Sequence, residues 1–401
     1  MAGPLPDGDP VPDDGSLPAS ALTGTDGSLA IYVHIPFCAS RCGYCDFNTY
    51  TAAELGAAPG ASQTSYVAAA LNEVALARRV LGPRTVSSVF VGGGTPTLLA
   101  SDTLVTVLGA IRETFDLADD AEVTTEANPE SVTPESLAAL REGGFTRMSF
   151  GMQSAVPHVL RTLDRVHTPG RAAQAVAEAR AAGFDDVSLD LIYGTPGESI
   201  ADWRTSLNAA LAAGPDHISA YALIVEDGTP LARRIRRGEL PAPDDDDLAD
   251  KYLLADELLE GAGYGWYELS NWARPGHPCR HNVAYWLSAD WWGIGAGAHS
   301  HVGGVRWWNV KHPAAYAERL GTGRSPGQAR EVLTADQRRV EQVLLEIRLA
   351  EGVPTTLLTP TERDRAADPI SRGLLTGIDG RLRLTLEGRL LADAVVRDLL
   401  D

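Results

Sequence analysis

The sequence predicts an α/β protein built around a parallel sheet, with a smaller helical unit at its C-terminal end. Between residue 29 and about residue 223, short runs of β-branched and aromatic residues alternate with Ala- and Leu-rich stretches of helical pattern. From about residue 325 the pattern is helical. Strands that alternate with helices form parallel sheets, so six such repeats predict a doubly wound sheet or part of a (β/α) barrel.

Length, composition and net charge exclude several classes of protein. A chain of 401 residues with 44% hydrophobic residues can form one large domain and a smaller one. It contains no apolar run of roughly 18 residues, and its first thirty residues lack the pattern of a secretory signal, so we expect a cytoplasmic protein without a transmembrane span. The net charge of −19 repels phosphate backbones, which makes nucleic acid an unexpected partner.

Four segments follow one another along the chain. Residues 1–28 hold five Asp, five Pro, five Gly and no Lys or Arg, and we expect a disordered tail there. Residues 29–235 form the α/β core. Its predicted strands lie near residues 30–35, 87–91, 122–126, 145–150, 186–192 and 217–223.

Residues 236–324 extend the core, and residues 325–401 form the C-terminal domain. The extension opens with an acidic run that suits the start of a helix over roughly 246–262, and residues 264–310 hold seven of the eight tryptophans. A hairpin over Gly373–Leu386 favours a small helical or winged-helix-like C-terminal domain. Residues 331–401 carry 10 Arg against 13 acids, which indicates a packing or partner module instead of a DNA-binding one.

Polar or glycine-rich residues follow all six predicted strands. Chemistry in both candidate folds gathers at the carboxyl ends of the strands, so these residues predict one large cofactor site on one rim. In chain order the segments are HIPFCASRCGYCDF, GGGTPT, Glu126–Pro129, Gly151–Gln153, Asp190 with Gly194–Gly197, and Tyr221–Ala222.

The first of these segments contains a cluster of cysteines. Cys38, Cys42 and Cys45 are spaced C-x-x-x-C-x-x-C, which can hold three irons of a [4Fe–4S] cluster and leave the fourth iron open. A zinc site with His34 as the fourth ligand, or a set of simple buried thiols, is the alternative. Cytosolic thiols clustered this tightly are usually metal ligands, and an open iron can chelate a small molecule.

This spacing, on a loop after the first strand, resembles the radical S-adenosylmethionine (SAM) proteins. The stretch IYVHIPFCASRCGYCDF is similar to the oxygen-independent coproporphyrinogen III oxidase group in particular. The resemblance implies a partial (β/α)6 barrel and an open iron that binds the amino and carboxylate groups of SAM. It also implies that the SAM contacts are Tyr32, Tyr44, Gly92, Gly93, Gly94, Thr95, Glu126, Gln153, Arg165, Asp190 and Ala222.

Two features separate the subgroups of this family. The oxidases carry a further cysteine two residues after the third, whereas here Asp46 and Phe47 follow Cys45. Residues 281–286 read HNVAYW and match the H-N-x-x-Y-W motif of the heme chaperones. The resemblance therefore implies a heme chaperone that delivers heme to respiratory or other apoproteins, as a monomer or homodimer with possible peripheral membrane contact. A coproporphyrinogen oxidative decarboxylase and a radical enzyme acting on an unrelated substrate are the alternatives, so enzyme activity stays open.

His281 is the candidate heme ligand. A neutral imidazole can ligate heme iron, and tryptophans could cover the macrocycle. The residues alone favour a different interpretation, a hydrogen-bonded histidine in an aromatic core. The tryptophans available are Trp286, Trp291, Trp292, Trp307 and Trp308, and the competing ligands are His277, His299, His301 and Cys279.

The run Gly293–Ala298 fits the G-x-G-x-x-A pattern of dinucleotide-binding sites. No acidic residue ends a second strand about twenty residues further on, and the surrounding sequence is rich in tryptophan. We therefore interpret the run as a closely packed strand or turn.

Overall fold

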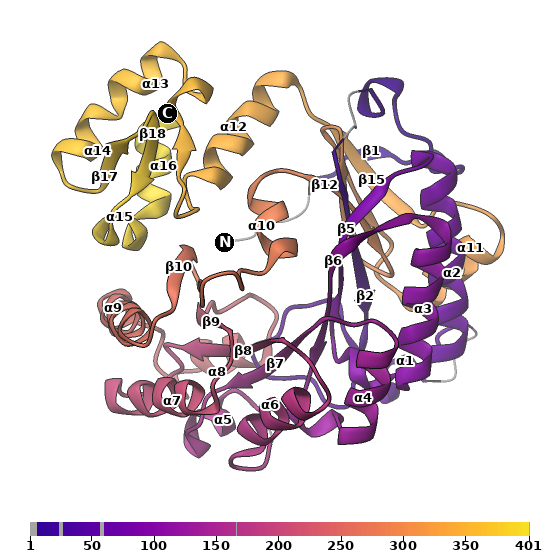
Figure 1. Ribbon diagram of the computed structural model, residues 1–401, viewed down its shortest axis with the longest axis horizontal. Helices are drawn as coiled ribbons and strands as arrows, with labels where there is room; N and C mark the ends of the chain where they lie inside the picture. The colour runs from indigo at the N-terminus through magenta and orange to yellow at the C-terminus, as the bar shows by residue number, and fades with distance from the viewer. Residues whose placement is uncertain (1–5, 24–26, 57–59, 166, 401) are drawn as a thin grey trace.

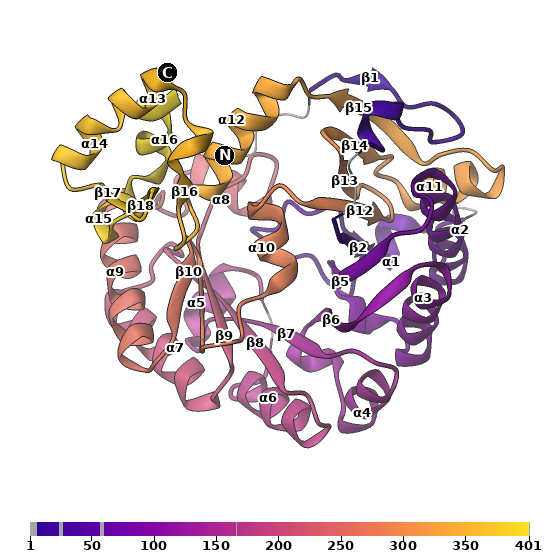
Figure 2. The same cartoon turned by 45° about the horizontal axis from the view of Figure 1, so that its top comes forward.

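Six parallel strands form the centre of the molecule, which is described here by a computed structural model covering residues 6–23, 27–56, 60–165 and 167–400. They are β2 (Leu29–Ile35), β5 (Thr85–Gly93), β6 (Asp116–Ala127), β7 (Arg147–Gln153), β8 (Asp186–Tyr193) and β9 (His217–Ala222). They lie side by side in chain order, whereas a doubly wound sheet would reverse the order at its centre. The sheet curves into a partial barrel (Figures 1 and 2).

Helices cover the outer face of the sheet (Figure 1). The main ones are α2 (Gln63–Leu81), α3 (Ser101–Thr114), α4 (Pro134–Glu142), α6 (Arg171–Ala181), α7 (Ile200–Ala213) and α9 (Asp245–Gly261). In α3 the buried residues are Leu104, Val107, Leu108 and Ile111, so one stripe at helical spacing faces the sheet. Shorter elements connect them: β3 (Phe37–Cys38), β4 (Tyr50–Thr51), α1 (Ala52–Leu55), α5 (Pro157–Thr162) and α8 (Pro230–Arg236).

The sheet continues past both ends of the barrel, to thirteen strands in all among the described residues. Beyond β2 lie β12 (Asp290–Ile294), β13 (His299–Val302), β14 (Val305–Asn309) and β15 (Gly327–Val332); beyond β9 lie β11 (Asn271–Ala273) and β10 (Gly265–Glu268). Two helices accompany them, α10 (Arg280–Trp286) and α11 (Pro313–Gly321). Much of the tryptophan-rich segment is therefore sheet, with Trp292 and Trp307 packed edge to face at 4.8 Å between ring centroids.

The glycine run in this extension is closely packed, as predicted. A Cβ on Gly293 would lie 2.0 Å from the carbonyl oxygen of His299, and one on Gly295, which has a φ of +116°, would lie 2.4 Å from the Tyr66 hydroxyl. Only glycine fits these two places.

The N-terminal residues that the structure describes are ordered, unlike the tail that the sequence predicts. β1 (Asp9–Pro10) pairs with β15 at the edge of the sheet, Ser325 donates its backbone N–H to Asp13, and Ala21 is buried. The composition of the segment conceals this because its order comes from backbone pairing with a strand more than 300 residues away.

The C-terminal unit begins at about residue 335, ten residues later than the sequence predicts, because β15 belongs to the main sheet. It comprises α12 (Ala335–Glu346), α13 (Pro360–Arg365), α14 (Ala367–Ser371), α15 (Leu386–Leu390), α16 (Ala392–Leu400) and the sheet β16 (Val353–Pro354), β18 (Arg381–Leu384), β17 (Leu375–Ile378). β17 and β18 form the predicted hairpin, and the unit has its own apolar core. Helices with a small antiparallel sheet give it a winged-helix-like form.

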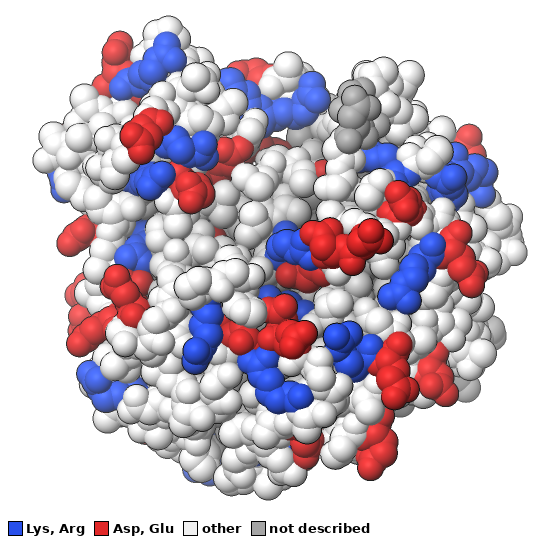
Figure 3. All heavy atoms as spheres, in the orientation of Figure 1, with Lys and Arg blue, Asp and Glu red and all other residues white. Residues whose placement is uncertain are grey.

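On the face shown in Figure 3, Lys and Arg side chains lie beside Asp and Glu and form no single basic patch. Of the helices in the described residues, none combines the length and apolar character needed to cross a membrane.

Candidate cofactor-binding site

A cavity of about 610 Å³ occupies the inside of the barrel, between the carboxyl ends of the strands and the cysteine loop. This volume is in the range of small-molecule and cofactor sites. Twelve of the fifteen residues that the sequence singles out line it: Cys38, Cys42, Tyr44, Cys45, Gly93, Gly94, Thr95, Glu126, Gln153, Arg165, Asp190 and Ala222. Tyr32, Gly92 and His281 are not among the residues that line it.

The cysteine loop is fastened to the glycine-rich turn after β5. The backbone N–H of Gly94 donates to Ile35 and that of Thr95 donates to Phe37, each at 2.8 Å. A Cβ on Gly94 would lie 2.5 Å from the Phe37 carbonyl oxygen and 3.0 Å from the Cys38 Sγ. Glycine is therefore required where the turn passes closest to the first thiol.

The three clustered thiols are half-buried at the cavity wall and are unpaired. Burial raises the pKa of the Cys38 thiol and raises the pKa of the Cys45 thiol to about 11. Thiolates are the form that binds metal, so occupation of this set by iron releases protons. Arg165 places its Nη1 3.5 Å from the Cys42 Sγ, so a positive charge lies beside the three thiols.

Glu126 is held against the glycine turn from the neighbouring strand. Its Oε2 accepts the N–H of Gly93 at 2.9 Å, and a Cβ on Gly92 would lie 2.8 Å from the same oxygen. Gly92 thus makes room for the carboxyl group although it does not line the cavity. Burial, followed by repulsion from Asp190, raises the pKa of Glu126 to about 7.

Asp190 is fixed by hydroxyl groups from the strands on either side of β8. Ser149 donates to it at 3.0 Å and Ser219 at 2.8 Å, while burial raises the pKa of the carboxyl group. This arrangement leaves a preorganised carboxylate facing the cavity, suited to accept hydrogen bonds from the hydroxyl groups of a ribose.

Gln153 adopts a φ of +63°, which is uncommon for a residue with a side chain. The strain lies at a bulge where β7 shifts register against β8. Arg165 reaches the same bulge and donates to the Gly151 carbonyl at 3.0 Å. Backbone strain of this kind clusters at ligand sites.

Tyr32 and His34 form a polar pair beside the cavity. The Tyr32 hydroxyl bonds the His34 Nδ1 at 2.9 Å, and the His34 Nε2 bonds the Asn48 carbonyl at 2.9 Å. Because both ring nitrogens of His34 have partners, the arrangement does not fit a zinc site completed by this histidine.

His281 lies at the base of the barrel, on α10. Its side chain is 1% exposed, its Nδ1 bonds Ser88 at 2.9 Å, and its Nε2 bonds Tyr285 at 2.9 Å. Its ring stacks on Phe90 at 5.3 Å between centroids. Both nitrogens are engaged, so this arrangement does not fit an axial heme ligand and matches the alternative of a hydrogen-bonded histidine in an aromatic core.

The competing ligands differ in accessibility. Cys279 is buried and donates to Glu122 at 3.4 Å, His301 bonds the Ala289 carbonyl at 3.2 Å, and His277 bonds Asp186 at 2.5 Å. His299 is exposed at the start of β13.

Sequence reasoning missed the lower part of the cavity, which is lined by Thr124, Arg147, Ser188 and His217. Thr124 and Ser188 precede the predicted site positions Glu126 and Asp190 on their strands by two residues, and side chains two residues apart on a strand share a face. The sequence therefore held a signal for these two residues, but none for Arg147 and His217.

Comparison with known proteins shows the family to which the chain belongs. The model of the Radical SAM superfamily matches residues 32–210. A Mycobacterium tuberculosis protein named heme chaperone HemW is 57% identical over 93% of this chain and 95% of its own, and the protein of that name from Escherichia coli is 34% identical over 92% and 97%.

Among solved structures, the radical SAM enzyme coproporphyrinogen III oxidase (HemN) from Escherichia coli superposes with a TM-score of 0.82 at 23% identity, over 95% of this chain and 92% of that one. At that identity the match shows the fold alone. The chain therefore belongs to the radical SAM superfamily and, within it, to the family of proteins named heme chaperone HemW.

Proposed function

We propose that this protein is a heme chaperone that carries a SAM-ligated [4Fe–4S] cluster, binds heme, and delivers it to heme-requiring proteins of the respiratory chain or elsewhere. One observation carries the proposal: 57% identity to a protein named heme chaperone over 93% of the chain. The proposal includes action in the cytoplasm, as a monomer or homodimer, with contact to the membrane surface where acceptor proteins reside.

The residues of the cavity fit a cluster and SAM. Three unpaired thiols can supply three iron ligands, Arg165 stands beside them to pair with a carboxylate, and Asp190 can accept from ribose hydroxyls. The cluster, when bound, would supply an open iron for the amino and carboxylate groups of SAM. The protein's own part is to hold and orient both groups.

Decarboxylation of coproporphyrinogen is the less favoured activity, because Phe47 stands where the oxidases have their additional cysteine. An assay for vinyl-group formation from coproporphyrinogen tests this directly, and robust conversion would overturn the chaperone proposal.

Cluster and SAM binding are tested separately. Anaerobic reconstitution should load about four irons, and replacing Cys38, Cys42 and Cys45 together with Ala should abolish this loading. Asp190→Asn should weaken SAM binding about tenfold and leave iron content unchanged, because it removes only a charged acceptor. Equal SAM affinity in the variant and the parent would contradict the assigned contacts.

Heme binding is tested by titration with hemin while the Soret band is followed. For His281 to ligate the iron, it must first release Ser88 or Tyr285, so Tyr285→Phe should strengthen binding and His281→Ala should abolish it. If His281 is structural, His281→Ala will lower the melting temperature and leave heme affinity intact, and the exposed His299 becomes the candidate to replace. No saturable hemin binding by the parent protein would refute the proposed function.

A further inference from the structure

The lower end of the cavity, beneath the residues assigned to SAM, is lined by polar side chains from four neighbouring strands, β6 to β9. Thr124 pairs in register with Arg147, and Ser188 pairs with His217. All four line the cavity and are buried. We call Thr124, Arg147, Ser188 and His217 the cavity floor.

Two donors on the cavity floor have no protein partner. The Oγ1 of Thr124, on a residue that is 0% exposed, and the Nδ1 of His217, on a residue that is 3% exposed, make no hydrogen bond within the described residues. Buried polar atoms are nearly always paired, and an orphan costs free energy unless something in the cavity satisfies it.

The hydrogen-bond network assigns the role of the His217 nitrogen. Asn282 donates its Nδ2 to the Tyr267 hydroxyl at 3.4 Å, and we assign the hydroxyl proton to the contact with the His217 Nε2 at 2.9 Å, since the hydroxyl makes no other hydrogen bond within the described residues. Burial lowers the pKa of His217 well below its ordinary value, so the ring is neutral and its single proton lies on Nδ1. His217 therefore presents a donor to the cavity.

Arg147 adds a positive charge whose hydrogen bonds go to uncharged oxygens. It donates to the His277 carbonyl at 3.1 Å and to the Ser188 hydroxyl at 2.9 Å, while the nearest carboxylate oxygens, on Asp186 and Glu122, lie 3.6 and 3.9 Å away. The side chain is 2% exposed. Both distances are those of ion pairs and neither is a hydrogen bond, so the charge of Arg147 is balanced without a direct bond to a carboxylate.

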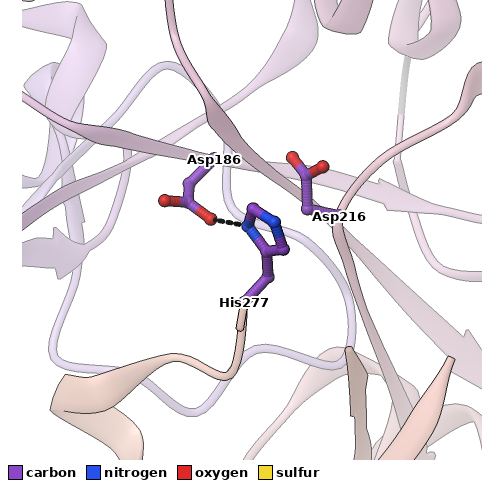
Figure 4. A group of neighbouring side chains, drawn as sticks. All are labelled: Asp186, Asp216 and His277. Atoms are coloured by element: carbon purple, nitrogen blue, oxygen red, sulfur yellow. Dashed lines mark hydrogen bonds and ion pairs between the residues drawn. The ribbon is translucent and has the colours of Figure 1, made fainter. Parts of the chain in front are cut away.

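The two acidic side chains near Arg147 are already engaged elsewhere. Glu122 accepts the backbone N–H groups of Arg280 and His281, both at 3.0 Å. Figure 4 shows the ring of His277 between the carboxylates of Asp186 and Asp216, and Arg180 pairs with Asp216. These contacts fix the base of the barrel and leave Thr124, Arg147 and His217 as donors on the cavity floor, below the carboxyl groups of Glu126 and Asp190.

We propose that the cavity floor is a binding site for the carboxylate group of a second small molecule, separate from the contacts assigned to SAM. Arg147 supplies the charge, and Thr124 and His217 supply hydrogen bonds from two sides. The proposal does not depend on heme delivery, since a free carboxylate could bind here in a protein that takes up no heme.

The test titrates the full-length protein with ¹³C-labelled propionate, with and without SAM, and follows the NMR line width. Propionate should bind saturably, and its uncharged analogue propionamide should bind at least tenfold more weakly. Thr124→Val and His217→Gln should each weaken propionate binding about tenfold, because each removes one donor to a charged group and conserves side-chain volume.

Matched variants control for damage to the fold. Thr125→Val alters the next residue of the same strand, whose hydroxyl donates to the Glu126 carbonyl at 3.3 Å, and should leave affinity unchanged. His217→Asn places an amide nitrogen near the former Nδ1 and should restore most of the affinity lost in His217→Gln.

A parallel titration with mesoporphyrin IX and its dimethyl ester separates two sources of the carboxylate. Binding of the acid but not of the ester, with the same dependence on Thr124 and His217, would support a porphyrin side chain as the source. Saturable propionate binding would support a free small carboxylate.

The proposal is overturned if neither probe binds saturably, which would leave ordered water as the occupant. It is also overturned if Thr124→Val and His217→Gln bind both probes as the parent does. Hemin uptake is measured apart from these titrations, so the two proposals can fail independently.

Discussion

At the scale of the residue, Gly94 controls how closely the turn after β5 approaches the first cluster thiol. Gly94→Ala should displace Cys38, because the new Cβ would lie 3.0 Å from the Sγ and 2.5 Å from the Phe37 carbonyl oxygen. We expect the reconstituted variant to hold clearly less iron and sulfide than the parent. Gly109→Ala, in open space on α3, is the matched control and should load normally. Normal loading of both variants would show that the turn tolerates a side chain.

The sequence predicted the upper half of the site and not the cavity floor, for a physical reason. Cys38, Cys42 and Cys45 are recognisable because their close spacing along the chain is typical of cluster ligands. Thr124 and His217 have no such constraint on spacing, and only the pairing of four strands brings them to the same cavity. The hydrogen bond between His281 and Ser88 could not be predicted either, because the two residues lie 193 positions apart in the chain.

At the scale of the element, Glu73 ties α2 to the sheet extension. Its carboxyl group accepts from Gly295 and Asn309, both at 2.8 Å, and from Tyr316 at 2.5 Å. Burial raises its pKa from 4.5 to about 7, so between these values the folded state binds a proton that the unfolded state has lost. Stability contributed by this group therefore falls as pH rises from about 4.5 to about 7.

Glu73→Gln should remove this pH dependence. Relative to the parent, the variant should gain roughly 1 kcal/mol of unfolding free energy per pH unit between pH 5 and 7, measured by urea unfolding. The exposed Glu257→Gln, on α9, should show no such trend. A constant difference between Glu73→Gln and the parent across this range would rule out a titrating Glu73.

Elements with a local signal were predicted well. The six barrel strands and α9 lie close to their predicted positions because apolar runs, turns and caps are encoded nearby in the chain. The antiparallel strands of the tryptophan-rich segment were not predicted, because their glycines and tryptophans fit a turn or an aromatic core equally well. Only the structure shows the pairing of these strands, for example of Trp291 with His301.

At the scale of the whole molecule, Arg389 joins the C-terminal unit to the barrel. Its guanidinium donates to both oxygens of Asp256 on α9, at 2.8 and 2.9 Å, and lies 4.3 Å above the ring of Trp266. Arg389→Met should make opening of the C-terminal unit easier by about 2 kcal/mol, seen as faster hydrogen exchange in α16 with α2 unaffected. Arg372→Met, whose ion pairs with Asp368 and Asp398 stay within the unit, should change little. Unchanged exchange in both variants would mean that other contacts hold the unit in place.

The N-terminal segment should stabilise the molecule although its composition suggests disorder. Deleting residues 1–17 removes the pairing of β1 with β15 and should lower the melting temperature measured by calorimetry. Gly327→Ala should act in the same direction, because its Cβ would lie 2.8 Å from the Val11 side chain, whereas Gly377→Ala, in open space, should not. An unchanged melting temperature after the deletion would contradict the prediction.

The position of β1 also affects whether copies of the protein can associate through the edge of the sheet. An uncovered edge strand offers a row of N–H and C=O groups with which another chain can pair, and β15 would be such an edge if β1 were absent. β1 covers it with only two residues, one of which, Pro10, lacks an N–H group. The sheet therefore ends in a strand that is short and poor in donors, a form that gives a neighbouring chain little to pair with, and we expect Asp9 and Pro10 to reduce edge-to-edge aggregation.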